Sequence, residues 1–156
     1  MNSFISYKSF INKYVNVILI FLFSVSINFY YSKFGAFPID TFLHYDSAYR
    51  ILNNEYPIKD FWTVSGFTVD FIQSIFFKIF GVSWFSYILH SSLLNGVIST
   101  LAFYYFLSLG LNKLSALIYS LSFAVLAYTI SGTPFVDLHA TFFLLIGTFF
   151  IIYALN

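Results

Sequence analysis

Four of the six acidic residues of this 156-residue chain lie in one short stretch, residues 40–62, which reads DTFLHYDSAYRILNNEYPIKDFW. The four are Asp40, Asp46, Glu55 and Asp60. An ionised aspartate can act as a general base, or it can bind a metal or a hydroxyl group. This stretch therefore contains the first candidates for a functional site.

Two of these carboxylates also have a structural explanation in a helix expected over residues 41–54. Asp40 or Thr41 is a candidate N-cap for that helix, and the helix amides help to keep an aspartate at that position ionised. Asp46 precedes Arg50 by four residues, which is the spacing of an ion pair on a helix surface. The functional and the structural roles both stay open at this point.

The other two carboxylates lie near Pro57. Glu55 and Lys59 have the spacing of a helical ion pair, but the proline between them argues against a helix there. Asp60, in the segment KDFW, is a candidate anchor for a turn. Structural and functional roles are equally open for these residues.

Histidines accompany two of the aspartates. His44 follows Asp40 by four residues, and His139 follows Asp137 by two. Two aspartates and two histidines on one face can bind a divalent metal, although the spacing matches no strong ligand motif and structural hydrogen bonding is the alternative. His90 lies in an apolar run among serines and an asparagine, so we expect it to form hydrogen bonds between helices.

Several classes of function find no support in the sequence. The chain has no glycine-rich phosphate loop, no G-x-S-x-G and no H-E-x-x-H, so a soluble type of nucleotide, hydrolase or zinc enzyme is not indicated. It has no cysteine, which excludes disulfides and thiolate chemistry. The net charge of +1 gives no reason to expect nucleic acid as a partner.

Composition decides the class of protein that must position these residues. The chain is 60% hydrophobic and 8% charged, with a mean hydropathy of +0.84. Soluble domains are about 25% charged, so this chain has too few charges for a surface that faces water. We therefore expect an all-α integral membrane protein.

The apolar runs predict a single membrane domain over residues 1–156 with about four transmembrane helices. The predicted spans are residues 15–31, 84–107, 114–130 and 138–155. The segment 32–83 between the first two contains two amphipathic helices, at about 41–54 and 67–80, which we expect at the membrane interface. A signal peptide cleaved after SVS at 24–26 is the alternative for the first run.

Orientation follows from the lysines beside the first span. Lys8 and Lys13 precede it, which favours a cytoplasmic N-terminus. The acidic stretch and the later loop SGTPFVD, residues 131–137, are then both on the outer face. They share one face in either orientation, because two predicted spans separate them.

The order of short motifs in this region resembles the start of polytopic GT-C glycosyltransferases. The motifs are the opening Asp40, the helical segment from Ala48 to Leu52, PIKDFW at 57–62, and F-G-x-S at 80–83. The resemblance is to the protein O-mannosyltransferase and aminoarabinose-transferase-like group of family 39/83, which includes the Rgt-like domain. It covers roughly residues 15–110. Those enzymes are longer, so the chain is expected to correspond to the N-terminal part of one.

The resemblance implies transfer of a sugar from a polyprenyl-phosphate-linked donor to a lipid, glycan or protein acceptor at the outer face of a bacterial inner membrane. It implies that Asp40 is the general base and that Asp137 is a second acid of the site. It also assigns substrate contacts, which are Arg50 and Lys59 for the phosphate, together with Asp60 and His44. A divalent metal is possible, and no other cofactor is implied.

A different class of function also fits the sequence. In that interpretation the chain is a non-enzymatic membrane subunit, a transporter-like bundle or an inactive truncated fragment. The acids of the first loop then only cap helices and form ion pairs.

Overall fold

The computed structural model describes residues 2–34, 38–63, 66–128 and 131–155, with side chains from Tyr14 onward except at 38 and 39. This described part is all-helical, as the sequence predicts, and no strand is assigned in it. The helices are α1 Asn2–Tyr31, α2 Pro38–Leu52, α3 Thr68–Phe80, α4 Trp84–Ser108, α5 Lys113–Leu126 and α6 Val136–Leu155.

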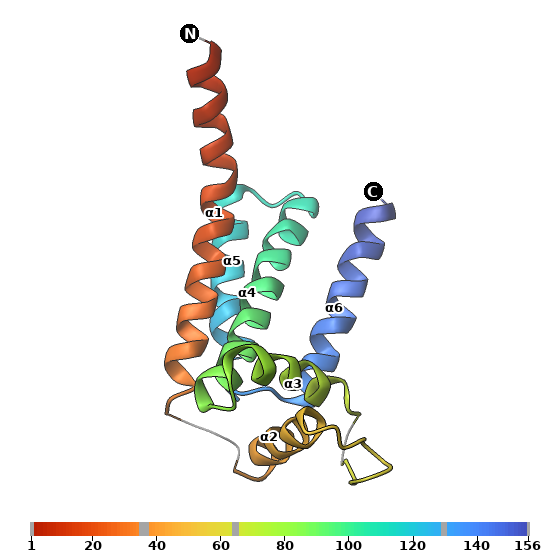
Figure 1. Ribbon diagram of the computed structural model, residues 1–156. Coiled ribbons are helices and arrows are strands. Elements are labelled where there is room, and N and C mark those ends of the chain that lie inside the picture. Colours follow the sequence, from red (N-terminus) through yellow and green to blue (C-terminus); the bar gives the residue numbers. More distant parts are fainter. Residues whose placement is uncertain (1, 35–37, 64–65, 129–130, 156) are drawn as a thin grey trace.

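The helices form two groups (Figure 1). α1, α4 and α5 pack against one another as a bundle, and α6 contacts α4. α2 and α3 pack together and lie across one end of the bundle, where α3 contacts α4. Both ends of the chain lie at the opposite end of the molecule.

The bundle contains polar contacts that join three of its helices. The Asn28 side chain of α1 donates hydrogen bonds to the hydroxyl groups of Ser91 and Ser92 on α4, at 3.2 and 3.0 Å. The Asn95 side chain of α4 donates to the carbonyl oxygens of Ser24 and Ala124, at 3.1 and 3.0 Å. Amide and hydroxyl groups that pair between helices are typical of packing inside a membrane.

Two helices in the described chain are long and apolar enough to cross a membrane. They are Tyr14–Tyr31 within α1 and Val136–Leu155, which is α6. α5 is apolar but has only 14 residues. α4 has 25 residues, but its buried serines, histidine and asparagine lower its mean hydropathy. Of the four spans expected from the sequence, two therefore correspond to helices whose length and composition suit a membrane span.

The two helices predicted between residues 32 and 83 are present, with shifted bounds. α2 begins at Pro38 rather than at residue 41, which is consistent with the preference for proline in the first turn of a helix. Asp40 therefore lies inside the first turn, and the prediction that Asp40 or Thr41 caps this helix is wrong. A carboxylate in the first turn still interacts favourably with the helix dipole.

The two motifs that flank α3 have clear structural roles. Gly81 ends α3 with φ +82°, and its N–H donates to the carbonyl of Phe77 at 2.9 Å. Ser83 caps α4, because its hydroxyl oxygen accepts a hydrogen bond from the Ser86 N–H at 3.3 Å.

In the loop before α3, a carboxylate oxygen of Asp60 accepts a hydrogen bond from the Tyr56 N–H at 2.8 Å. Asp60 therefore anchors the turn, as the sequence indicates.

Candidate functional site

The first turn of α2 lies against the loop that precedes α6. The hydroxyl groups of Thr41 and Thr133 share a hydrogen bond of 3.0 Å. The buried Tyr87 of α4 donates its hydroxyl proton to the Thr41 carbonyl at 2.7 Å. These contacts bring the segments that carry Asp40 and Asp137 together, although the two aspartates are far apart in the sequence.

Both aspartates predicted from the sequence are accessible. Asp40 lies in the first turn of α2 and Asp137 in the first turn of α6, and both are exposed. A helix N-terminus stabilises a negative charge in its first turn. Each carboxylate is therefore open to a ligand at the N-terminal end of a helix.

A buried histidine–aspartate pair lies beside this exposed region. His44 Nδ1 of α2 is 2.6 Å from Asp70 Oδ1 of α3, and each side chain is only 2% exposed. Burial raises the pKa of the Asp70 carboxyl group above its usual range, and the hydrogen bond with His44 opposes that rise. The pair fixes α2 on α3 and orients the His44 ring.

A second histidine pair connects α3, α4 and α6. His90 Nε2 and His139 Nε2 are 3.0 Å apart, and His90 Nδ1 is 2.9 Å from the Gln73 side-chain oxygen. His139 Nδ1 is 2.8 Å from the Tyr128 hydroxyl group. The prediction that His90 forms hydrogen bonds between helices is confirmed.

The proton positions in this second pair follow from its partners. The Gln73 oxygen can only accept, so His90 carries its proton on Nδ1 and accepts at Nε2. His139 then donates from Nε2 and accepts from Tyr128 at Nδ1. The Tyr128 hydroxyl oxygen also accepts from the Phe135 N–H at 2.8 Å. His139 Nδ1 also lies 3.0 Å from the Phe135 carbonyl oxygen, and the Gln73 side-chain nitrogen is buried without a hydrogen-bond partner in the described part of the chain.

The predicted phosphate contacts lie toward the other end of α2. Arg50 follows Asp40 by ten residues, which is about 15 Å along a helix. Its guanidinium group contacts Asp46 at 2.8 Å and Glu55 at 3.2 Å, and it lies over the Phe61 ring. The predicted ion pair between Asp46 and Arg50 is confirmed.

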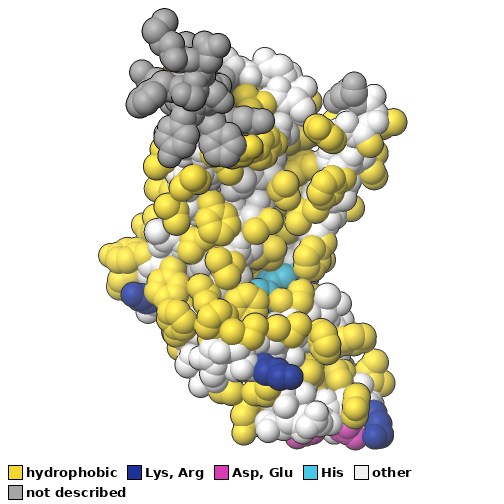
Figure 2. All heavy atoms as spheres, turned by 45° about the horizontal axis from the view of Figure 1, so that its top comes forward, with side chains coloured by type: hydrophobic (Ala, Val, Ile, Leu, Met, Phe, Trp, Pro, Cys, Tyr) yellow, Lys and Arg dark blue, Asp and Glu magenta, His cyan; other side chains and the backbone are white. Residues whose placement is uncertain are grey.

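Lys59 and Asp60 are in the loop that follows α2. Lys59 Nζ is 3.9 Å from Asp60 Oδ1 and lies over the Tyr56 ring, with its side chain 75% exposed. Figure 2 shows acidic and basic side chains together at this end of the molecule, whereas the visible sides of the helical bundle are mostly hydrophobic. The structure therefore places Asp40, His44 and Asp137 in one region and Arg50, Lys59 and Asp60 in another.

The predicted metal-binding set is not assembled in the structure. Within the described ranges, no group of three or more histidine or acidic side chains is placed to hold a metal ion. His44 pairs with Asp70 and His139 pairs with His90, and the two exposed aspartates lie outside both pairs.

Sequence reasoning missed the buried contacts of Asp70, Gln73 and Tyr87. Asp70 and Gln73 belong to the helix that the sequence predicts over residues 67–80, and both are buried. Their spacing of three residues, with Phe77 four residues after Gln73, was a signal that they share one face. Their partners His44 and His90 are on other helices, so the sequence around Asp70 and Gln73 does not predict these hydrogen bonds.

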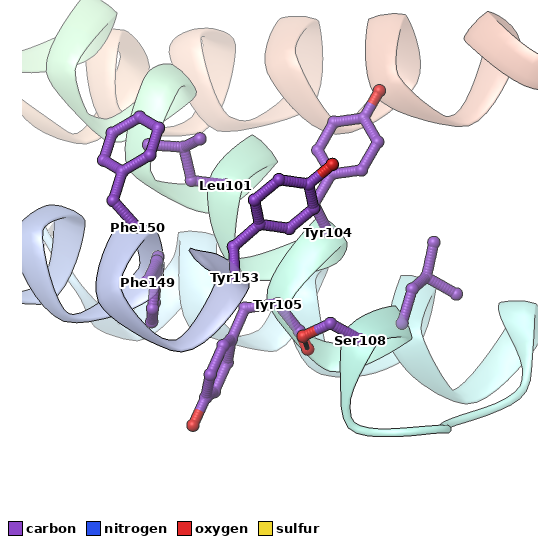
Figure 3. Close-up of a pocket in the computed structure, with 8 residues that line it drawn as sticks. Leu101, Tyr104, Tyr105, Ser108, Phe149, Phe150 and Tyr153 are labelled. Atoms are coloured by element: carbon purple, nitrogen blue, oxygen red, sulfur yellow. Dashed lines mark hydrogen bonds between the residues drawn. The ribbon is translucent and has the colours of Figure 1, made fainter. Parts of the chain in front are cut away.

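A groove between α4 and α6 lies away from this region. It has a volume of about 520 Å³, and Tyr105 and Phe149 stack in it with ring centroids 4.5 Å apart. Figure 3 shows the aromatic side chains of both helices around it. Its lining residues are Leu101, Tyr104, Tyr105, Leu107, Ser108, Phe149, Phe150 and Tyr153. None of the predicted site residues lines it.

Comparison of the chain with known protein families, curated proteins and solved structures finds no match.

Proposed function

We propose that the chain is the membrane part of a GT-C type glycosyltransferase, with its site at the end of the bundle that carries α2 and α3. The observation that supports this best is the contact between Thr41 and Thr133. It joins the segment of Asp40, the predicted general base, to the segment of Asp137, the predicted second acid. The order of motifs around Asp40 supplies the reaction class.

The proposed membrane arrangement has α1, α4, α5 and α6 as spans, with α2 and α3 in the outer interface. The faces of α3 support this arrangement. Its inner face buries Asp70 and Gln73, whereas Phe71, Ile75 and Ile79 are 55%, 44% and 65% exposed. A helix with apolar residues outside is suited to the boundary between headgroups and acyl chains.

In the proposed reaction, Asp40 removes the proton from an acceptor hydroxyl group. The hydroxyl oxygen forms a bond to the anomeric carbon of the sugar. The bond between that carbon and the phosphate oxygen breaks, and the electron pair leaves with the polyprenyl phosphate. The two predicted phosphate ligands, Arg50 and Lys59, lie in a different region from Asp40 and are paired with carboxylates, so the proposal gives them no contact with this phosphate.

The test is sugar transfer by the chain in proteoliposomes that contain undecaprenyl phosphate linked to radiolabelled mannose. We expect Asp40→Asn to lower transfer by about 10²- to 10⁴-fold, the usual contribution of a general base. Asp46→Asn is the matched control, because Asp46 is an exposed carboxylate on the same helix, and its ion pair among the described residues is with Arg50. Transfer that is undiminished in Asp40→Asn would remove Asp40 from the role of base.

A non-enzymatic membrane subunit is the second candidate. It is favoured by the local contacts of Asp46, Glu55 and Asp60, which are all explained by an ion pair or a turn. A folded chain that transfers no sugar from the donor would favour this alternative.

A further inference from the structure

Two buried imidazole rings on different helices face each other in the bundle. His90 Nε2 of α4 and His139 Nε2 of α6 are 3.0 Å apart, and the two residues are only 4% and 1% exposed. No step of the proposed transfer reaction uses either ring. Ionisable groups inside a membrane bundle are costly, and they often mark a site or a path for ions or protons.

The outer nitrogen of each ring lies next to an oxygen that accepts hydrogen bonds. His90 Nδ1 is 2.9 Å from the Gln73 side-chain oxygen, and His139 Nδ1 is 3.0 Å from the Phe135 carbonyl oxygen. Neither oxygen carries a proton that it could donate. The pair of rings therefore has an acceptor at both of its ends.

Two neutral rings do not need both acceptors. Each neutral imidazole has one N–H, so one ring donates outward from Nδ1, the other donates across the pair from Nε2, and the second Nδ1 has no proton. The Tyr128 hydroxyl group, 2.8 Å from His139 Nδ1, donates to that nitrogen in the neutral state. With one more proton both Nδ1 atoms become donors, and each already has its acceptor in Gln73 or Phe135.

We infer that His90 and His139 form one proton-binding site, which takes up a single proton and shares it between the facing Nε2 atoms. The inference does not depend on the proposed sugar transfer. The ring of Phe76 supports it, because this ring is stacked on His90 with centroids 4.9 Å apart and planes at 20°. The face of an aromatic ring attracts a cation at that distance.

The surroundings of the pair act on the added charge in both directions. Burial disfavours any charge at this position, and a protonated His44 would repel it. Asp70 offsets the charge of His44, since the two side chains are 2.6 Å apart. The titratable groups on the elements packed around the pair are His44 of α2, Asp70 of α3, Tyr87 of α4, Tyr128 after α5 and Asp137 of α6.

Uptake of the proton changes the hydrogen bonds of the loop before α6. In the charged state His139 Nδ1 carries a proton, so the Tyr128 hydroxyl group can no longer donate to it, and the Phe135 carbonyl oxygen becomes its acceptor. The same loop contains Thr133, which shares a hydrogen bond with Thr41 of α2. A change in pH is therefore expected to reach the segment 131–135, next to the candidate site.

The experiment is ¹⁵N NMR of the histidine-labelled chain in nanodiscs, over a series from about pH 8 to about pH 4, which brackets the usual titration of histidine. The chain has three histidines, so single substitutions assign the rings. We expect His90 and His139 to change together in one step that corresponds to one proton, with a coupling between their Nε2 nuclei across the hydrogen bond. In a sample with ¹³C-labelled carbonyl groups, the Phe135 signal should shift in the same step.

Gln73 offers two variants with opposite expected effects. Gln73→Leu removes the acceptor of the His90 Nδ1–H, so the shared step should move to lower pH. Gln73→Glu replaces that acceptor with a carboxylate, so the step should move to higher pH. His139→Gln keeps a hydrogen-bonding side chain but removes the second ring, and the shared step should disappear. SDS unfolding shows which variants are folded, and the wild-type series decides the inference if they are not.

Several results would overturn the inference. The two rings could titrate in separate steps, as independent structural histidines do, or neither ring could change over the series. A Phe135 carbonyl signal that stays in place, or folded Gln73 variants that both move the step in one direction, would also contradict it. None of these measurements uses sugar transfer, so a chain that transfers no sugar would refute the proposed function and leave the proton-binding site standing.

Discussion

Gly132→Ala is expected to be among the most destabilising of the glycine substitutions, because two costs add at this position. Gly132 has φ +68°, which L-residues rarely adopt, and an added Cβ would lie 2.9 Å from the Ser32 Cα. Its carbonyl also accepts hydrogen bonds from the side chains of Asn28, Ser32 and Ser91. This residue therefore holds the segment 131–135 against α1 and α4.

The magnitude follows from the two terms. A left-handed backbone costs an L-residue about 1–2 kcal/mol, and overpacking costs about 1–3 kcal/mol. The contact at Ser32 is with backbone, which cannot move aside as a side chain can. We therefore expect Gly132→Ala to lower the free energy of unfolding by about 2–5 kcal/mol.

Gly110→Ala separates the two terms. Gly110 has φ +85°, but an added Cβ meets nothing within 4 Å. It should therefore show only the backbone cost of about 1–2 kcal/mol. Reversible unfolding by SDS in mixed micelles measures both variants. If Gly132→Ala is no more destabilised than Gly110→Ala, the close contact between Gly132 and Ser32 is refuted.

Two further predictions concern the buried pairs. The pKa of Asp70 is raised above its usual value of 3.8. The unfolded chain therefore loses this proton at a lower pH than the folded chain does, and the free energy of unfolding falls as pH rises from about 3.8 through the raised pKa. Asp70→Asn should show a smaller fall in an unfolding series over pH, and an identical fall would contradict the assignment. His139→Phe removes the hydrogen bonds to His90 and Tyr128 and leaves both buried without that partner, which should cost about 1–3 kcal/mol per group. SDS unfolding measures this loss against His139→Gln, which keeps some of the hydrogen-bonding capacity, and equal stability of the two variants would show that the bonds contribute little.

Local patterns in the sequence predicted the features that depend on neighbours along the chain. The apolar runs, together with the amphipathic helices predicted over 41–54 and 67–80, located the six helices of the described chain, and the four-residue spacing of Asp46 and Arg50 predicted their ion pair. The start of α2 was misplaced by three residues, because the preference of Pro38 for a first helical turn was not weighed against the capping preference of Asp40.

The buried polar contacts were beyond local patterns. Periodicity places Asp70 and Gln73 on one face of α3, but it does not say whether that face points to lipid, water or protein. Their partners His44 and His90 are on α2 and α4, so the pairs form only when three helices pack. The contact between Thr41 and Thr133 is likewise a tertiary feature that no spacing encodes.

The central claim is that Asp40 and Asp137 serve one site for sugar transfer, and a double-mutant cycle on transfer tests it most directly. Initial rates are measured in the same proteoliposomes for wild type, Asp40→Asn, Asp137→Asn and the double variant. Residues that act together have non-additive effects. We predict that wild type transfers sugar, that each single variant is impaired, and that the double variant is much less impaired than the product of the two single losses. No transfer by wild type, or single losses that simply multiply, would contradict the claim.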